Sequence, residues 1–158
     1  MDEEILAVIE VSPLRRAFGI AVLVCFGAVL IYVALATPPA PGWQLFLIAV
    51  GGLSLWMADR MRRATAQRLE LTATALRDDA GLRIVEIADI AGLERGTFAF
   101  KPSNGFVIRT RSGAARHWRP GLWWRLGRRV GVGGVTSAPQ TKAMAQIIEA
   151  MLLERGEG

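Results

Sequence analysis

The chain has 158 residues, of which 52% are hydrophobic and 21% charged, enough for one small domain and a membrane anchor. Its 19 basic and 14 acidic residues give a formal net charge of +5, and none of them lies within residues 17–58. This distribution excludes a purely soluble protein and an intrinsically disordered one. The single cysteine, Cys25, excludes a small domain held together by intramolecular disulfides.

Residues 1–16 form a short polar head before the first apolar segment. A cleaved signal peptide would place basic residues in this head, whereas Glu3 and Glu4 stand there together with Arg15 and Arg16. The apolar segment also exceeds the length of a typical signal-peptide core. We therefore expect the segment to remain in the chain as a membrane helix.

Two uncharged segments predict a helical hairpin over residues 17–58. Residues 17–36 would form a helix about 30 Å long, which matches the hydrocarbon core of a bilayer. Three prolines within residues 37–42 end that helix and leave a short external loop. Residues 43–58 are shorter, but Trp43 and Trp56 at their ends suit the two membrane interfaces. We predict two transmembrane helices, with a re-entrant or interfacial helix as the alternative for the second.

Arginines flank both helices on one side of the hairpin, and the loop between the helices is uncharged. The positive-inside rule therefore places both termini in the cytoplasm, which predicts a multi-pass protein of the bacterial inner membrane. Small residues at contact spacing are expected to pack the two helices, namely Ala21, Cys25 and Ala28 against Gly51, Ser54 and Ala58. Residues 59–68 form a basic connector to the domain. The candidate juxtamembrane lipid contacts are Arg15, Arg16, Arg60, Arg62 and Arg63.

Residues 69–158 are predicted to form a cytoplasmic α+β domain. From Leu69 apolar and polar residues alternate, and turn signals stand at residues 78–81, 103–105 and 112–113. About five to seven short antiparallel strands follow from this pattern, in a small sheet or barrel. The expected strands cover residues 69–73, 82–87, 92–100, 106–111, 116–119 and 128–132.

One amphipathic helix closes the chain. Ser137, Pro139 and Gln140 predict its start with a capping box, and Gly156 ends it. Its apolar stripe consists of Met144, Ile147, Ile148, Met151 and Leu152. We expect this stripe to dock on the sheet, because so small a domain needs it for its own core. The alternative is a helix that binds a partner or the bilayer.

Three local segments carry a resemblance to a known family. They are residues 71–76 leading into a turn, residues 87–90, and the glycine-rich residues 127–134 before the closing helix. With the two apolar helices ahead of them, they resemble bacterial pleckstrin-homology-like (PH-like) membrane proteins with an N-terminal two-helix hairpin, over most of residues 15–155. The resemblance implies a PH-like barrel closed by one C-terminal helix. It also implies non-enzymatic work in the assembly or stabilisation of membrane complexes.

The residues that carry chemistry are few. His117 is the only histidine, and no nucleophile-elbow sequence accompanies it, so a structural role is the better interpretation. Cys25 and His117 together cannot form a conventional zinc site. The glycines of residues 127–134 match neither a dinucleotide fingerprint nor a P-loop. We therefore predict no catalytic, cofactor-binding or metal-binding residues and do not expect an enzyme. An enzyme of unrecognised type is the remaining alternative.

A basic stretch between Glu94 and Glu149 contains ten Lys and Arg residues and no acidic one. Such a surface suits anionic lipid, an acidic protein partner or nucleic acid, and it is also found as a plain solvated face in arginine-rich proteins. The candidate contact residues are Arg116, Trp118, Arg119, Leu122, Trp123, Trp124, Arg125, Arg128 and Arg129. The predicted partners are membrane lipids and another integral-membrane protein, and nucleic acid is not expected. The function favoured by the sequence is an accessory, assembly or scaffold protein, with an anionic-lipid-responsive module as the alternative.

Overall fold

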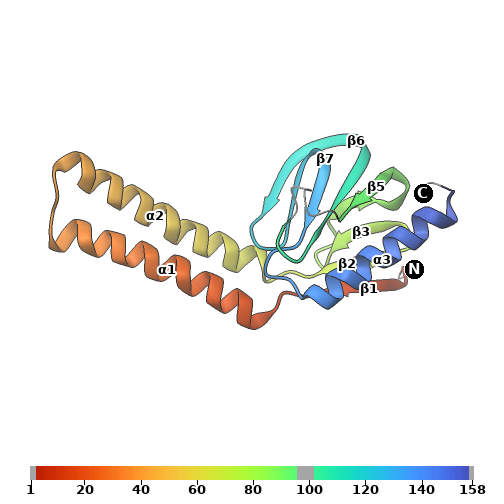
Figure 1. The fold of residues 1–158 in the computed structure, drawn as a ribbon, viewed down its shortest axis with the longest axis horizontal. Coiled ribbons are helices and arrows are strands. Elements are labelled where there is room, and N and C mark those ends of the chain that lie inside the picture. Colours follow the sequence, from red (N-terminus) through yellow and green to blue (C-terminus); the bar gives the residue numbers. More distant parts are fainter. Residues whose placement is uncertain (1–2, 96–101, 157–158) are drawn as a thin grey trace.

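The computed structural model describes residues 3–95 and 102–156. Two long helices form an antiparallel hairpin that projects from a domain of strands and one helix (Figure 1). The predicted α+β layout is confirmed. A closed barrel is not formed, because the described strands pair in two separate antiparallel sheets with the orders β1-β2-β3-β4 and β5-β6-β7.

The elements have the following bounds in chain order. The strands are β1 (Ile5–Ile9), β2 (Leu69–Thr72), β3 (Ala75–Asp78), β4 (Arg83–Glu86), β5 (Ile90–Glu94), β6 (Phe106–Arg119) and β7 (Trp123–Val132). The helices are α1 (Pro13–Ala36), α2 (Pro41–Ala64), the short 3-10 helix η1 (Ile87–Asp89) and α3 (Ala138–Glu154).

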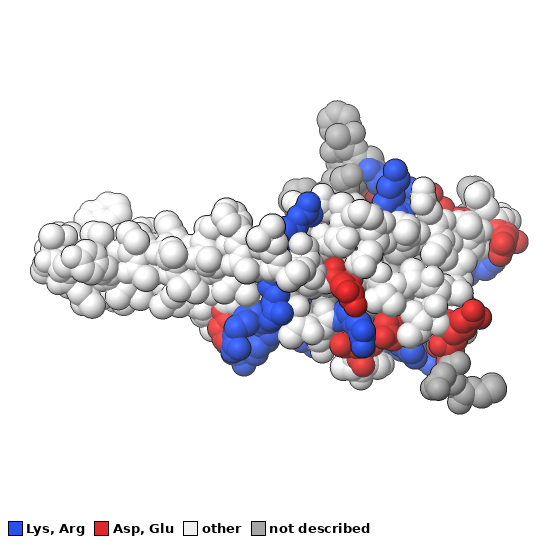
Figure 2. Space-filling view, turned by 90° about the horizontal axis from the view of Figure 1, so that it is seen from below, with Lys and Arg blue, Asp and Glu red and all other residues white. Residues whose placement is uncertain are grey.

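Helices α1 and α2 are both long and apolar enough to cross a membrane. Each begins at a proline, where the missing N–H of Pro13 or Pro41 costs no helical hydrogen bond. Both extend beyond the predicted segments, and α2 takes in residues 59–64 of the predicted connector. Figure 2 shows this hairpin free of charged side chains up to its junction with the domain, where basic residues gather.

The contact between α1 and α2 is centred on two glycines. A Cβ atom on Gly27 would lie 2.8 Å from the carbonyl oxygen of Gly51, so only glycine allows this approach. Ser54 Oγ donates a hydrogen bond of 2.8 Å to the carbonyl oxygen of Leu23. In α2 the predicted residues Gly51, Ser54 and Ala58 are indeed buried. In α1 the prediction was wrong, because the exposed side carries Ala21, Cys25 and Ala28, and the buried residues are Gly27 and Ala34.

The helical hairpin is inserted between two neighbouring strands of one sheet. Strand β1 precedes α1 and pairs with β2, which follows α2, through Ile9 opposite Leu69 and Ile5 opposite Thr72. Within the predicted head, Ile5–Ile9 form an edge strand and α1 begins at Pro13. Only residues 10–12 and 65–68 connect this pair of strands to the two helices.

The remaining strands differ from the prediction in two places. Residues 69–78 form a hairpin, β2–β3, in which Thr72 Oγ1 accepts the backbone N–H of Ala75 at 3.1 Å. Strand β6 passes straight through the turn predicted at residues 112–113, because the extra residues are absorbed by a bulge between Arg109 and Ala114. The predicted turn at residues 78–81 is confirmed, with the N–H of Leu82 donating to Asp78 Oδ1 at 2.8 Å. Of the predicted strand 92–100, residues 96–100 lie outside the described residues.

Helix α3 packs its apolar stripe into the core of the domain. Met144, Ile148 and Leu152 are buried there, and Ile147 and Met151 are partly buried against it, so the predicted docking is confirmed. The predicted capping box was wrong, because the Ser137 side chain makes no cap hydrogen bond. The Gln140 side chain instead accepts the backbone N–H of Glu10 at 2.9 Å, which ties α3 to the end of β1.

Candidate functional site

The candidate site is the outer hairpin, which we define as residues 114–119 of β6 and 123–129 of β7. Both strands curl beyond the β6 bulge, and the outer hairpin turns back toward the end of α2 (Figure 1). Its pairing is specific, with His117 opposite Arg125 and Trp118 opposite Trp124. Paired residues of antiparallel strands share a face, so the two tryptophans lie on the same side of the outer hairpin.

The turn that closes the outer hairpin lies against the end of α2. Gly121 has a φ of +83°, and a Cβ atom there would lie 3.1 Å from Thr65 and 3.4 Å from Met61 of the α2 end. Its carbonyl oxygen also accepts the N–H of Val135 at 3.0 Å. Met61 in turn contacts Gly19 of α1. These contacts, which we call the junction, place the start of the outer hairpin beside the helical hairpin.

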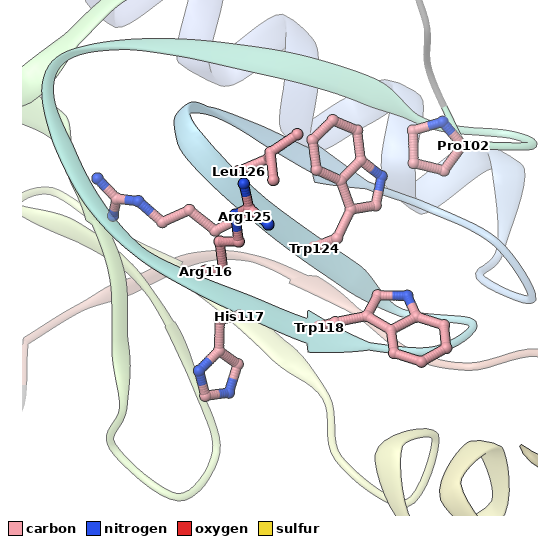
Figure 3. Close-up of a pocket in the computed structure, with 7 residues that line it drawn as sticks. All are labelled: Pro102, Arg116, His117, Trp118, Trp124, Arg125 and Leu126. Atoms are coloured by element: carbon pink, nitrogen blue, oxygen red, sulfur yellow. The ribbon is translucent and has the colours of Figure 1, made fainter.

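The curl of the outer hairpin encloses an open cavity of about 550 Å³. Trp124, Leu126 and Pro102 lie along one side of it and Trp118 along the other (Figure 3). Trp118 is 47% exposed and Leu126 54% exposed. The full lining is Pro102, Arg116, His117, Trp118, Trp124, Arg125 and Leu126. Two large apolar side chains thus remain in solvent at the rim of a cavity, as binding surfaces commonly show.

A glycine lies beneath Trp124, one of the residues that line this cavity. Trp124 is half-buried, and its indole lies over Gly131, where a Cβ atom would come within 2.2 Å of the ring. No other residue type fits beneath the indole without moving it. The glycines of this stretch suggest curvature in the sequence, but this packing role was not predicted from them.

Two of the predicted contact residues belong to the core instead. Leu122 is fully buried and Trp123 is only 3% exposed, so neither is available to a partner. The Trp123 ring stacks on His117 with centroids 4.9 Å apart, which gives His117 a structural contact. The two residues that follow the turn fill the space beneath the curl, and the apolar sequence Leu122-Trp123-Trp124 does not reveal which of its members point inward.

Arg125 fastens the outer hairpin to the first sheet rather than projecting freely. Its Nη1 donates a hydrogen bond of 2.7 Å to the carbonyl oxygen of Ile84 in β4. A second tie joins η1 to the β6 bulge, since Asp89 accepts hydrogen bonds from the Ser112 backbone N–H at 2.9 Å and from its hydroxyl. Burial opposes the charge on Asp89, but the Ser112 hydrogen bonds, with Arg125 and Arg111 nearby, outweigh it and lower the pKa of that carboxyl. Side-chain bonds thus hold this side of the domain together, where no backbone pairing joins the two sheets among the described strands.

Three exposed arginines of the outer hairpin have no acidic partner. Within residues 3–95 and 102–156, no carboxylate lies within ion-pair distance of Arg116, Arg128 or Arg129. Arg119 is half-buried, and its Nε is buried without a hydrogen-bond partner among the described residues. Of these unpaired arginines, Arg116 lines the cavity, and Arg128 and Arg129 lie further along β7.

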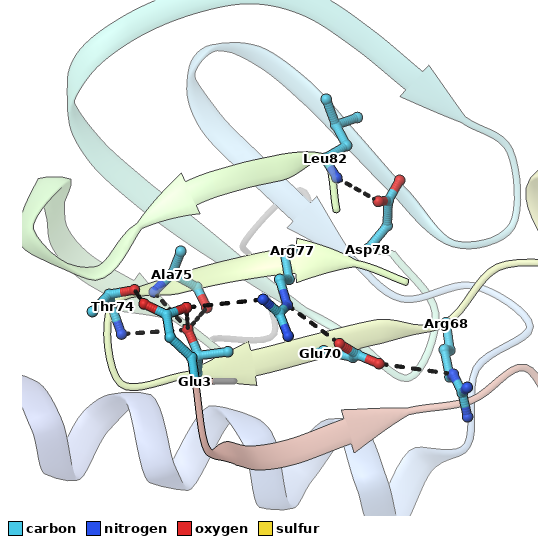
Figure 4. A network of polar contacts seen from close by, with 9 residues as sticks. Glu3, Arg68, Glu70, Thr74, Ala75, Arg77, Asp78 and Leu82 are labelled. Carbon is cyan, nitrogen blue, oxygen red and sulfur yellow. Dashed lines mark hydrogen bonds and ion pairs between the residues drawn. The ribbon is translucent and has the colours of Figure 1, made fainter. Parts of the chain in front are cut away.

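In the first sheet, by contrast, arginines form ion pairs with glutamates of the same chain (Figure 4). Arg77 Nε lies 3.3 Å from Glu70, and its Nη1 lies 3.9 Å from Glu3. Arg68 lies 3.9 Å from Glu70. Hydrogen bonds from Thr74 and Thr72 to the Glu3 side chain, with Arg83 and Arg77 nearby, lower the pKa of Glu3. The charges on this face of the first sheet are therefore paired within the domain.

The five juxtamembrane arginines are also largely engaged within the chain. Arg62 and Arg63 form ion pairs with Asp59. Arg16 donates to the carbonyl oxygen of Arg62 at 3.1 Å, and Arg15 to that of Thr136 at 3.3 Å. Arg60 lies over the ring of Trp56, 5.5 Å from its centre. The five arginines predicted to contact lipid therefore also make contacts within the chain.

No group of three or more His, Cys, Asp or Glu side chains is placed to hold a metal ion in the part of the chain that the structure describes. The function is therefore inferred from the helical hairpin and the outer hairpin alone. No protein-family model, curated protein or solved structure matches this chain.

Proposed function

We propose that this chain is a non-enzymatic accessory protein of a bacterial inner membrane whose domain binds another integral-membrane protein. The observation that carries the proposal is the open apolar cavity of the outer hairpin, with the unpaired Arg116 in its lining and the two apolar helices beside it. An exposed apolar surface of this kind in a small domain is typical of an interaction site.

The anchor in this proposal consists of α1 and α2, which cross the bilayer. The start of α1 and the end of α2 both join the domain, so both termini of the chain lie on the side of the membrane that the domain occupies. Arginines gather at this end and the α1–α2 loop has none, which favours the cytoplasmic side. The seven described strands and the closing helix support the PH-like resemblance, with the helical hairpin inserted after the first strand.

The chemistry of the partner follows from the outer hairpin. Leu126 offers an exposed apolar side chain, and the same hairpin carries the exposed cations Arg116, Arg128 and Arg129. The complementary surface is acidic with an apolar residue at its centre, and tryptophan and arginine are the residue types that dominate binding energy at such contacts. Because the junction holds the outer hairpin in place before binding, little ordering cost opposes association.

Copurification tests this proposal. The full-length chain, tagged and expressed in its own host, is purified in mild detergent, and the associated membrane proteins are quantified by mass spectrometry. We expect one or more of them to be lost from the combined variant Leu126→Asp, Arg128→Gln and Arg129→Gln.

The matched control is Leu153→Asp, which places the same charge at an exposed leucine of α3 away from the outer hairpin. The control should keep the associated proteins at their normal amounts. Equal recovery with the triple variant and with the control would contradict the proposal, provided that both chains reach the membrane in normal amounts.

A further inference from the structure

We propose that Trp118 is a second membrane contact, whose indole enters the interfacial layer of the leaflet beside α2. The domain would then rest on the lipid head groups in addition to being held by its two helices. This inference rests on the proposed membrane span of α1 and α2, and it requires no protein partner.

The height of Trp118 follows from the junction. The uncharged run of α2 ends at Ala58, and Met61 and Thr65 lie about 5 and 10 Å further along the helix axis. The interfacial layer on each side of the hydrocarbon core is itself about 5–8 Å thick. Met61 therefore lies within this layer and Thr65 just outside it, and Gly121 packs against both, so the turn of the outer hairpin stands at the outer edge of the head groups.

Trp118 stands close to this turn. It precedes Pro120 by two residues, or about 7 Å of extended strand. In Figure 3 its indole lies on the side of the cavity toward the helix at the lower edge of the view, and Trp124 and Pro102 lie across the cavity from it. Leu126 is four residues from Leu122, about 13 Å along the other strand, and therefore lies further from the junction. Of the two exposed apolar residues at the rim of the cavity, Trp118 is thus nearer to the junction and Leu126 is further from it.

The chemistry of the residue fits lipid at that height. Trp118 is about half exposed, and no aromatic ring stacks on it among the described residues. An indole has an apolar body and one N–H donor, which is why tryptophan collects at membrane interfaces. Trp56 of α2, with Arg60 over its ring, already marks the same interface on the helix. Arg116, two residues before Trp118 and without an acidic partner in the described chain, adds a cation for lipid phosphate.

The position is also held firmly. Beyond the Gly121 contacts, the N–H of Gly133 donates to the carbonyl oxygen of Leu122 at 2.9 Å, and that of Val135 to Gly121 at 3.0 Å. Trp118 pairs with Trp124, which is fixed over Gly131. The indole is therefore presented at one height and does not depend on the movement of a loop.

Fluorescence quenching in nanodiscs tests the inference with the full-length chain alone. In a Cys25→Ser background, Trp118→Cys carries a small environment-sensitive label, and the lipids carry a quencher at the top of their acyl chains. Leu153→Cys, an exposed leucine of α3, carries the same label as a control. A third chain, Arg116→Cys, retains Trp118 and reports on the native side chain.

We expect the labels at positions 118 and 116 to be quenched several-fold more than the label at position 153. We also expect Trp118→Ala to reduce the quenching at position 116. Equal quenching at all three positions would overturn the membrane contact. A chain that alkaline carbonate strips from native membranes would overturn the proposed anchor itself, so the two failures are distinguishable.

Discussion

The inner and outer halves of the β6–β7 hairpin share two continuous strands and differ in their surroundings. In the inner half Phe106 and Ile108 lie opposite Val132 and Val130, and all four are buried beneath α3 and the first sheet. In the outer half Trp118 and Leu126 remain half exposed. The bulge at residues 110–113 separates the two halves, because it allows the strands to curl away from the core. One hairpin therefore both completes the core and forms the cavity.

The same contrast holds for charge. Arginines of the first sheet are balanced by Glu70 and Glu3, whereas Arg116, Arg128 and Arg129 of the outer hairpin have no described acidic partner. Surface ion pairs contribute little to stability, so the balance on the first sheet is not required for folding. The distinction instead separates a surface whose charges are paired within the chain from the surface to which we assign a partner in the proposed function.

The largest expected effect concerns the buried tryptophan of the outer half. Trp123→Ala should lower the free energy of unfolding by about 3–5 kcal/mol, because it removes a buried indole from the core. Trp118→Ala, a matched change at the exposed tryptophan, should stay within about 0.5 kcal/mol. Chemical unfolding of the detergent-solubilised chain measures both. Similar losses for the two variants would erase the division between core and rim.

The second prediction concerns Gly131→Ala, at the glycine that lies beneath the Trp124 indole at the side of the cavity. The added methyl group collides with the Trp124 indole, and we expect a loss of about 1–3 kcal/mol as the ring is displaced. Combining it with Trp124→Ala removes the collision, so the two changes should be clearly non-additive in a double-mutant cycle. Additive losses would mean that the indole does not lie over Gly131.

Arg125 is the arginine of the outer hairpin that has a structural bond. Arg125→Met should cost about 1–2 kcal/mol, because the carbonyl oxygen of Ile84 loses its charged donor. Arg129→Met, at an exposed position of the same strand, should change stability by less than about 0.5 kcal/mol. Thermal unfolding of the two variants, measured side by side, distinguishes the hydrogen-bonded Arg125 from Arg129, which has no described acidic partner.

The smallest effect concerns pH. Because the pKa of Asp89 is lowered in the folded chain, its hydrogen bonds with Ser112 add stability above its ordinary pKa and lose that contribution as the pH falls through the lowered value. Asp89→Asn should therefore be less stable than the parent chain near neutral pH, and the difference should shrink below about pH 4. Glu3, whose pKa is also lowered, is present in both chains, so its contribution cancels. A difference that stays constant across this range would exclude the Asp89 charge as its source.

Much of the architecture follows from the sequence alone. Residues 17–58, which are uncharged and interrupted by the prolines of residues 37–42, predict two long apolar helices, and the structure contains both. The stripe through Met144, Ile148 and Leu152 determines which face of α3 docks, because its opposite face is polar. The turn at residues 78–81 is likewise local, as Asp78 binds the N–H of Leu82 four residues away.

The helix contacts, the pairing of β1 and the burial of the tryptophans depend on tertiary structure, because the local sequence pattern does not determine them. In α1 almost every residue is apolar, so periodicity does not show that Gly27, rather than Ala21 or Cys25, faces α2. Strand β1 is short, and only its pairing with β2, on the far side of the helical hairpin, makes it part of the sheet. Trp118, Trp123 and Trp124 are chemically identical, and their burial depends on what lies across each face of a curled hairpin. Which tryptophan is buried is therefore determined by long-range contacts. Side chains alternate between the two faces of a strand, but this alternation does not specify which face packs against the core.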